Sequence, residues 1–293
     1  MSPFFLRLAP AVFVLLWSTG WISARAATPH AGPLTFLLIR FFLAAAVLLA
    51  VVWIWRAPWP TTRSAWGHSL IAGALINTFY LAAVWWAIAK GVPAGISGVI
   101  AALQPILTAM LAPQLLQERV SARQWLGIAV GFAGIILVLL PKLTVAGVGG
   151  LAGLQGMLVL NALGMLSVTL GVFYQKRFVP SGDLRTMTFI QYLGALAMIL
   201  PLALLLETPR FDINLVSVAT LAWSVLAISI GAVALFMMLI REGAVSRAAA
   251  LIYLVPPVAA LQAWLFFGEV LAPIQLCGMA LTVAGVALAV RKD

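Results

Sequence analysis

Charge is what this sequence has least of. Of its 293 residues only 8% are Asp, Glu, Lys or Arg, whereas 64% are apolar. Soluble domains carry about 25% charged and about 45–50% apolar residues. So few charges cannot cover such a large apolar fraction in water, and the mean hydropathy of +1.14 agrees. The composition excludes an ordinary soluble enzyme, a disordered chain and a nucleic-acid-binding protein, and it predicts an all-α integral membrane protein.

Metal ligands are equally scarce. Cys277 is the single cysteine, and His30 and His68 are the only histidines. One thiol excludes a disulfide framework and a cysteine-based metal site, and two histidines are too few for a cluster. The sequence also contains neither an HExxH motif nor a DxxD motif. We therefore expect no metal, no cofactor and no enzymatic activity.

Long apolar runs fill most of the chain. A helix needs about 20 apolar residues to cross a bilayer, and ten such helices leave only short loops. We predict spans near residues 4–24, 34–55, 66–89, 93–115, 122–140, 150–174, 186–206, 217–240, 245–267 and 274–290. The first run, followed by Ala24-Arg25-Ala26, imitates a signal peptide with its cleavage site. It is long for a cleaved segment, so we interpret it as the first transmembrane helix.

The basic residues are distributed unevenly between the two sides of the predicted bundle. Twelve lie on the side of the N-terminus and the even loops, four lie in the odd loops, and Arg40 is within a span. Because cytoplasmic loops carry the excess of Lys and Arg, both termini are predicted to be cytoplasmic. The predicted location is the inner membrane of a bacterium.

One block of the sequence occurs twice, at residues 104–134 and 256–285. An offset of 151 pairs Glu118 with Glu269, Gln124 with Gln275, Gly127 with Gly278 and Gly134 with Gly285, and Pro105 pairs with Pro257 at 152. Each copy ends a group of five spans, so the two groups cross the bilayer in opposite directions. Inverted repeats of this kind are typical of secondary transporters, whose substrate site lies near the midplane. We predict two repeats of five helices, residues 1–143 and 144–293.

The same block resembles a known family, together with WSTGWISAR (17–25) and FLLIRFFLAA (36–45). These segments are similar to the EamA-type branch of the drug/metabolite transporter superfamily, and the chain looks most like bacterial exporters of aromatic amino acids of the YddG type. The resemblance implies ten helices in two inverted halves, a central cavity and export of small metabolites. The second half has no convincing counterpart to Arg40.

Polar side chains recur at helical spacing inside several predicted spans. Asn77 and Tyr80 are three residues apart on the third span, Gln104 belongs to a small and polar face of the fourth, and Trp17 lies on a stripe of the first. The second half adds Asn161, Tyr253 and Gln262. Each can simply bond two helices together. Gathered around a symmetry axis, the set is interpreted as a substrate-binding lining, in which amides and hydroxyls bind a zwitterion and aromatic rings its side chain.

Proline residues interrupt the predicted fourth and ninth spans at matched positions. Pro105, Pro256 and Pro257 are predicted to lie in the middle of these helices, where each removes a backbone hydrogen bond and kinks the helix. Two interpretations are open: a hinge beside the binding site, or a static kink needed for packing.

Three charges remain to be interpreted as gating or structural. Arg40 is seven residues into the second span, roughly 10 Å deep at 1.5 Å per residue. We favour snorkelling toward the periplasmic surface, with binding of a substrate carboxylate and pairing with another helix as alternatives. Glu118 is favoured as structural, because Ser121 and Gln124 have the spacing of a capping box. For Glu269 a gating and a structural role stand equal.

The sequence thus predicts a secondary transporter that exports small amphipathic metabolites, above all aromatic or other neutral amino acids, by alternating access. No acidic residue lies near the midplane of a predicted span, so we expect facilitated movement rather than carboxylate-based proton coupling. A sugar or nucleotide-sugar carrier and a channel-like facilitator are the alternatives. The expected partners are a small-molecule substrate and the lipid bilayer, with no nucleic acid, in a monomer or weak homodimer.

Overall fold

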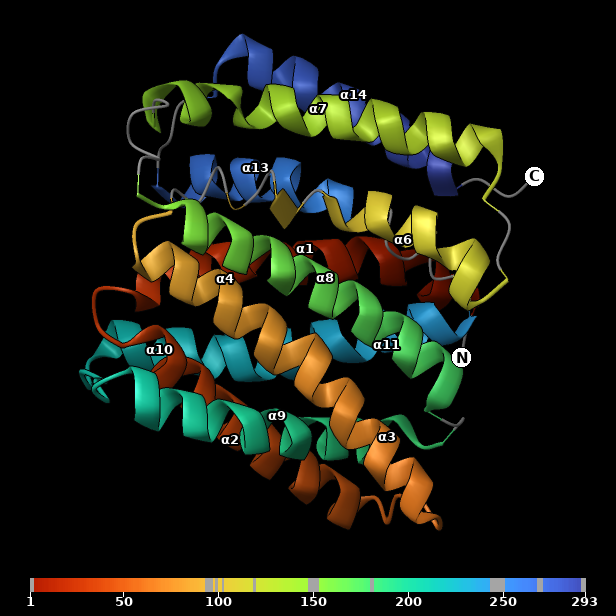
Figure 1. Cartoon of the computed structure of the whole chain (residues 1–293), viewed down its shortest axis with the longest axis vertical. Helices are drawn as coiled ribbons and strands as arrows, with labels where there is room; N and C mark the ends of the chain where they lie inside the picture. Colours follow the sequence, from red (N-terminus) through yellow and green to blue (C-terminus); the bar gives the residue numbers. More distant parts are fainter. Residues whose placement is uncertain are drawn as a thin grey trace.

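The chain is a bundle of antiparallel helices (Figure 1). The computed structural model describes residues 3–92, 97, 100–101, 103–117, 120–146, 153–179, 182–242, 251–267 and 271–290. Within these ranges the residues form ten helical stretches: α1 (Pro3–Ala27), α2 (Pro33–Ile54), α3–η1–α4 (Arg63–Gly73, Ala74–Phe79, Tyr80–Ala89), α6 (Leu103–Leu115), α7 (Ala122–Ala146), α8 (Gln155–Phe178), α9 (Leu184–Leu206), α10–η3–α11 (Leu215–Trp223, Ser224–Ala232, Val233–Glu242), η4–α13 (Leu251–Leu254, Val255–Phe267) and α14 (Pro273–Val290).

Most of the predicted spans coincide with these stretches to within a few residues, and the predicted starts of the fourth and ninth, at residues 93 and 245, lie outside the described residues. The sixth is an exception, because α8 begins at Gln155 and not at residue 150. Gly153 has a φ of +88°, which a helix cannot accommodate, so the helix begins only after this glycine. The end of the same helix is correspondingly later, at Phe178.

The outer surface of the bundle is apolar. Trp53 on α2 and Leu205 on α9 are both 81% exposed, in a belt of exposed leucine, valine, isoleucine and aromatic side chains. Soluble monomers rarely expose so many large apolar side chains to water. Five of the described helical stretches are long and apolar enough to cross a membrane: 33–54, 63–89, 155–178, 184–206 and 215–236. Three shorter apolar stretches, 8–24, 122–138 and 273–289, add to them.

Helices α7 and α14 are packed so closely that their backbones touch. They lie side by side at the top of Figure 1. A Cβ atom on Gly285 would lie 2.3 Å from the backbone nitrogen of Gly131, and one on Gly127 would lie 2.6 Å from the carbonyl oxygen of Gly285. Gly134 meets the Gly278 carbonyl in the same way, at 2.7 Å. Because Gly127 contacts Gly285 while Gly134 contacts Gly278, the helices run antiparallel and equivalent residues of the two repeats contact each other reciprocally.

A second pair of equivalent helices, α2 and α9, packs at the opposite end of the bundle (Figure 1). The rings of Phe41 and Tyr192, which are 151 positions apart, contact each other with centroids 5.8 Å apart. Residues related by a two-fold axis touch only near the axis. The axis of the inverted repeat therefore passes close to Phe41 and Tyr192, which lie near the middle of the lengths of α2 and α9.

The third and eighth helices share an unusual feature. Each contains a π-helical stretch, η1 (Ala74–Phe79) and η3 (Ser224–Ala232), at positions that the same offset of 151 brings into register. A π stretch is rare and is frequently found at functional sites. η1 packs against α8 and α9, and η3 packs against α1 and α2, so the two stretches occupy equivalent places around the axis.

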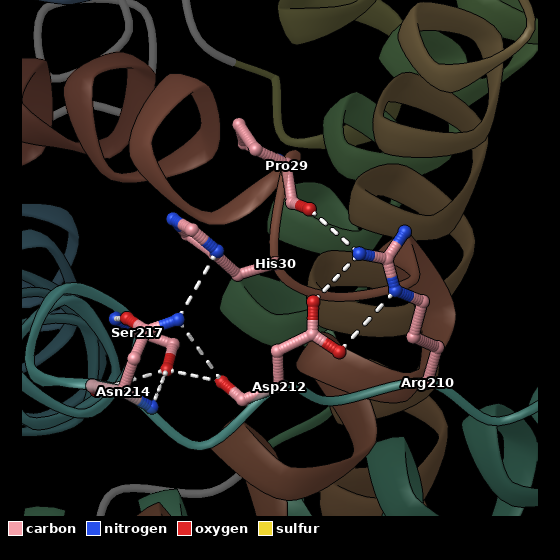
Figure 2. A network of polar contacts seen from close by, with 6 residues as sticks. All are labelled: Pro29, His30, Arg210, Asp212, Asn214 and Ser217. Atoms are coloured by element: carbon pink, nitrogen blue, oxygen red, sulfur yellow. Dashed lines mark hydrogen bonds and ion pairs between the residues drawn. The ribbon is translucent and has the colours of Figure 1, made fainter.

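The loops after α1 and after α9 are joined at one end of the bundle (Figure 2). Asp212 N donates to His30 O at 2.7 Å, and Gly32 N donates to Arg210 O at 3.0 Å. The Arg210 guanidinium donates to Asp212 and to the carbonyl of Pro29, and it lowers the pKa of the Asp212 carboxyl, chiefly through this hydrogen bond. The loops thereby tie the first helices to α9 and α10.

Candidate functional site

Arg40 is buried inside the bundle. It lies on α2, next to the axis residue Phe41, and its side chain is only 5% exposed. The Nε group donates a hydrogen bond of 2.8 Å to the Ser229 hydroxyl on η3. The prediction that Arg40 snorkels to the surface is therefore wrong, because the side chain turns toward the eighth helix instead. The contact with another helix, one of the two alternatives, is present.

Two tyrosines accompany Arg40. The Tyr192 hydroxyl donates to the carbonyl of Ser229 at 2.7 Å, so α2 and α9 bind the same residue of η3. Tyr80 and Tyr192 both interact electrostatically with the guanidinium. Tyr80 also packs against both apolar cores of the bundle, the one around Phe13 and the one around Phe41. Arg40, Ser229, Tyr192 and Tyr80, which we call the axial polar cluster, thus join helices of both halves at the level of the axis.

Three of the predicted amide residues are buried and Gln262 is half-buried, and the four do not form one group. Asn77, on η1, is 5% exposed and its Nδ2 has no hydrogen-bond partner among the described residues. Asn161, on α8, donates from Nδ2 to the Ser97 hydroxyl at 2.7 Å, which joins the fourth helix to the sixth. Gln104 is buried on α6. Gln262, on α13, donates to the carbonyl of Leu15 at 3.1 Å.

The predicted aromatic residues lie around one apolar core. Trp17 and Tyr80 pack against the cluster that contains Tyr253. The Trp17 ring also contacts Phe13 and Phe236, with centroids 5.3 and 5.6 Å away. Tyr253 is 1% exposed, and its ring covers Gly131 on α7. Its hydroxyl has no partner among the described residues, so a buried hydrogen-bonding group remains available there.

The prolines of the predicted hinge lie on α6 and α13. Pro105 is the third residue of α6, and Pro256 and Pro257 follow the first residue of α13. Residues 100 and 101, just before α6, are helical as well, and the kink expected at these prolines stays a prediction. The ninth helix is nevertheless discontinuous, because the 3-10 turn η4 changes to α13 at this point.

The acidic residues of the described ranges lie in loops or at helix ends, as expected. Asp183 caps α9 and Glu207 follows its last residue. Glu118 and Glu269 lie outside the described residues. The capping box beside Glu118 is confirmed, since Ser121 N donates to Gln124 Oε1 at 2.8 Å and Gln124 N donates to Ser121 Oγ at 3.3 Å.

Sequence reasoning missed Gln191, Tyr192 and Ser229. The offset of 151 carries from the repeated block to α2 and α9, where it pairs Arg40 with Gln191 and Phe41 with Tyr192. That extension would have found the first two. Ser229 lies in a run of mostly small and apolar residues, and only the packing of η3 against α2 gives it a role.

Comparison with known proteins gives a consistent result over the whole chain. The model of the EamA-like transporter family matches residues 8–140 and again residues 155–291. Among curated relatives, the uncharacterized transporter YvbV of Bacillus subtilis is 27% identical, covering 97% of this chain and 90% of the relative. The uncharacterized inner membrane transporter YedA of Escherichia coli K12 is 28% identical, covering 97% and 90%. A probable amino-acid metabolite efflux pump of Salmonella typhimurium is 25% identical, covering 93% and 90%. A solved crystal structure superposes with a TM-score of 0.77 at 22% identity, covering 98% of this chain and 97% of that one, which establishes the fold alone.

Proposed function

The chain belongs to the EamA-like transporter family, and we propose that it exports small amphipathic metabolites, above all aromatic or other neutral amino acids, from the cytoplasm. Its membership makes it a multi-pass inner-membrane transporter and not an enzyme. The choice of amino acids is supported by the printed name of the Salmonella relative, an amino-acid metabolite efflux pump, and by the polar and aromatic character of the residues near the axis.

The observation that carries the proposal is the axial polar cluster. In a bilayer, buried polar side chains are costly and mark the paths of substrates. Here they lie beside the two-fold axis, between helices of both halves, where inverted-repeat transporters bind their substrates. Asn77 Nδ2 and the Tyr253 hydroxyl are buried without partners among the described residues, so they are available to a polar ligand. Trp17 and Tyr80 offer flat apolar surface to its side chain.

The symmetry of the fold supports alternating access. Two halves that repeat the same five helices in opposite directions can exchange conformations, and the exchange turns the site from one side of the membrane to the other. We propose that both termini are cytoplasmic, from the excess of Lys and Arg on their side, and that α6 and η4–α13 adjust at Pro105, Pro256 and Pro257. Export then moves substrate toward the side of the loops that contain His30 and Arg210.

The acidic residues at the helix ends favour facilitated transport. A proton-coupled carrier needs a group that titrates within the path, such as a buried carboxylate or histidine. The described carboxylates lie at helix ends and in loops. We therefore propose that the substrate follows its own gradient.

Counterflow into proteoliposomes tests the proposal. Liposomes with purified protein are loaded with one unlabelled amino acid at a time, and uptake of the same labelled amino acid is followed without a pH difference. We expect transient accumulation for aromatic or other neutral amino acids and none for nucleotide sugars. Counterflow with nucleotide sugars alone would contradict the substrate class, and uptake without saturation or counterflow would indicate a channel. Accumulation driven by an imposed pH difference and abolished by an uncoupler would contradict facilitated transport.

A further inference from the structure

We propose that Arg40 is the anchor of the substrate: its guanidinium binds a carboxylate of the transported molecule in the middle of the bundle. The inference rests on the proposed function, because it names the charged group that such a transporter recognises. It also assigns the specificity for that group to one residue.

The first argument is the missing counter-charge. Arg40 is buried, yet no carboxylate of the described residues pairs with it, and the four described acids lie in loops or at helix ends. Inside membrane proteins, ionisable residues nearly always pair with a partner or face a polar path. A carboxylate that arrives with the substrate supplies the partner that the described residues do not provide.

The second argument is the geometry of the guanidinium. Ser229 Oγ accepts from Nε at 2.8 Å and fixes the side chain. The two terminal nitrogens have no acceptor among the described residues. Arginine binds carboxylates with two parallel hydrogen bonds from neighbouring nitrogens. These two nitrogens are therefore the part of the guanidinium that suits a carboxylate, and the hydrogen bond from Nε to Ser229 holds the group in place.

The third argument comes from the repeat. The position equivalent to Arg40 in the second half is Gln191, on α9, which is 1% exposed. Its Nε2 group donates to Gln175 Oε1 at 3.3 Å. A neutral amide thus fills the equivalent place between packed helices. Packing at this position does not require a positive charge, so the charge of Arg40 has a purpose other than packing.

The surroundings agree with an anion at this place. Asn77 Nδ2 is a buried donor with no acceptor among the described residues, and it lies one turn before Tyr80, which interacts with Arg40. The Arg40 position adjoins Phe41, whose contact with Tyr192 marks the axis. A carboxylate bound here would lie between the halves, where both conformations can reach it.

Benzoate and benzamide are the probes that test the anchor, because they differ only in the charged group. The thermal unfolding midpoint of the purified protein in detergent is titrated with each compound, with sodium chloride at equal ionic strength as the reference. We expect benzoate to raise the midpoint and benzamide not to. Arg40→Gln, which copies the residue tolerated at position 191, should weaken the apparent affinity for benzoate by roughly ten- to hundredfold. Arg40→Lys should retain part of it, since the charge remains.

Arg185→Gln is the matched control. It removes an arginine that pairs with Asp183 at the start of α9, and it should bind benzoate as the wild type does. If Arg40→Gln does not fold, Ser229→Ala serves instead, and its weaker benzoate binding is expected because the guanidinium loses its fixed orientation. Equal effects of benzoate and benzamide on the wild type, or unchanged benzoate binding in Arg40→Gln, would overturn the proposal.

The failure of the proposed function would look different. Benzoate binding that depends on Arg40, without counterflow of any amino acid, would leave the anchor standing and refute the amino-acid substrate. Counterflow of amino acids that is the same in the wild type and in Arg40→Gln would refute the anchor and leave the function standing.

Discussion

Replacing Gly285 by alanine should separate the two helices that hold the halves together. The new Cβ would lie 2.3 Å from Gly131 N and 2.6 Å from Gly127 O, about 1 Å closer than ordinary contact allows. Both neighbours are backbone atoms of α7, so no side chain can move aside. Overpacking of a tight site costs about 1–3 kcal/mol, and we expect the upper end of this range because a whole helix must shift.

The control is Gly20→Ala on α1, where a Cβ would meet nothing within 4 Å. Alanine in a helix is favoured over glycine by roughly 0.5–1 kcal/mol, so this variant should be as stable as the wild type or more so. Both variants are purified and unfolded by heat in the same detergent, with tryptophan fluorescence as the readout. A Gly285→Ala midpoint equal to that of Gly20→Ala would refute the close packing of α7 and α14.

Three further predictions concern topology, the binding site and a helix cap. A reporter fused after Asp293 should be cytoplasmic and one inserted beside Arg210 periplasmic; finding both on one side would exclude the three spans predicted between them and with them the ten-span fold. In a background without Cys277, single cysteine replacements are made at Asn77, Tyr80, Gln104 and Tyr253, and substrate should protect them from a polar thiol reagent. Transport that persists without any protection would show that these positions do not line the site. The Asp183 carboxylate accepts a hydrogen bond from Arg185 N at 2.9 Å and forms an ion pair with the Arg185 side chain. The hydrogen bond from that side chain is the main reason why the pKa of Asp183 is lowered. This contribution is present at neutral pH and lost as the pH falls through the lowered pKa, so Asp183→Ala should cost about 1 kcal/mol at pH 7 and little under strongly acidic conditions; an equal loss at both pH values would contradict the assignment.

The sequence was sufficient for the helices and for part of their packing. Apolar runs of membrane-spanning length are visible one by one, so the ten helical stretches lie close to the predicted ranges. The repeated glycines Gly127, Gly134, Gly278 and Gly285 proved to be the contact between α7 and α14, because the absence of a side chain at matched positions permits close approach. The ten-helix fold with two inverted halves is confirmed by the structure and by its solved neighbour. The boundary between residues 143 and 144 stays a prediction.

The candidate site was less accessible from the sequence. The direction of Arg40 depends on Ser229, which is 189 positions away and belongs to a helix whose π stretch has no local sequence signal. An analysis of residue spacing assumes a regular α-helix throughout, so it cannot show that a wider π-helical turn begins at Ala74 or Ser224.

The cap of α2 makes the two halves unequal. Asp183 caps the start of α9 from within its own half, whereas its equivalent Gly32 has no side chain, and a Cβ there would overlap the Glu207 carboxylate. Glu207 takes its place and accepts from Leu34 N at 2.8 Å and Thr35 N at 3.0 Å. A rearrangement that moves the C-terminal end of α9 away from α2 leaves these two N–H groups without their acceptor. The symmetry-related rearrangement leaves the cap at the start of α9 intact, because Asp183 belongs to the same segment. Under the proposed alternating access, the two conformations should therefore differ in free energy, and we expect the state in which Glu207 remains on α2 to be favoured.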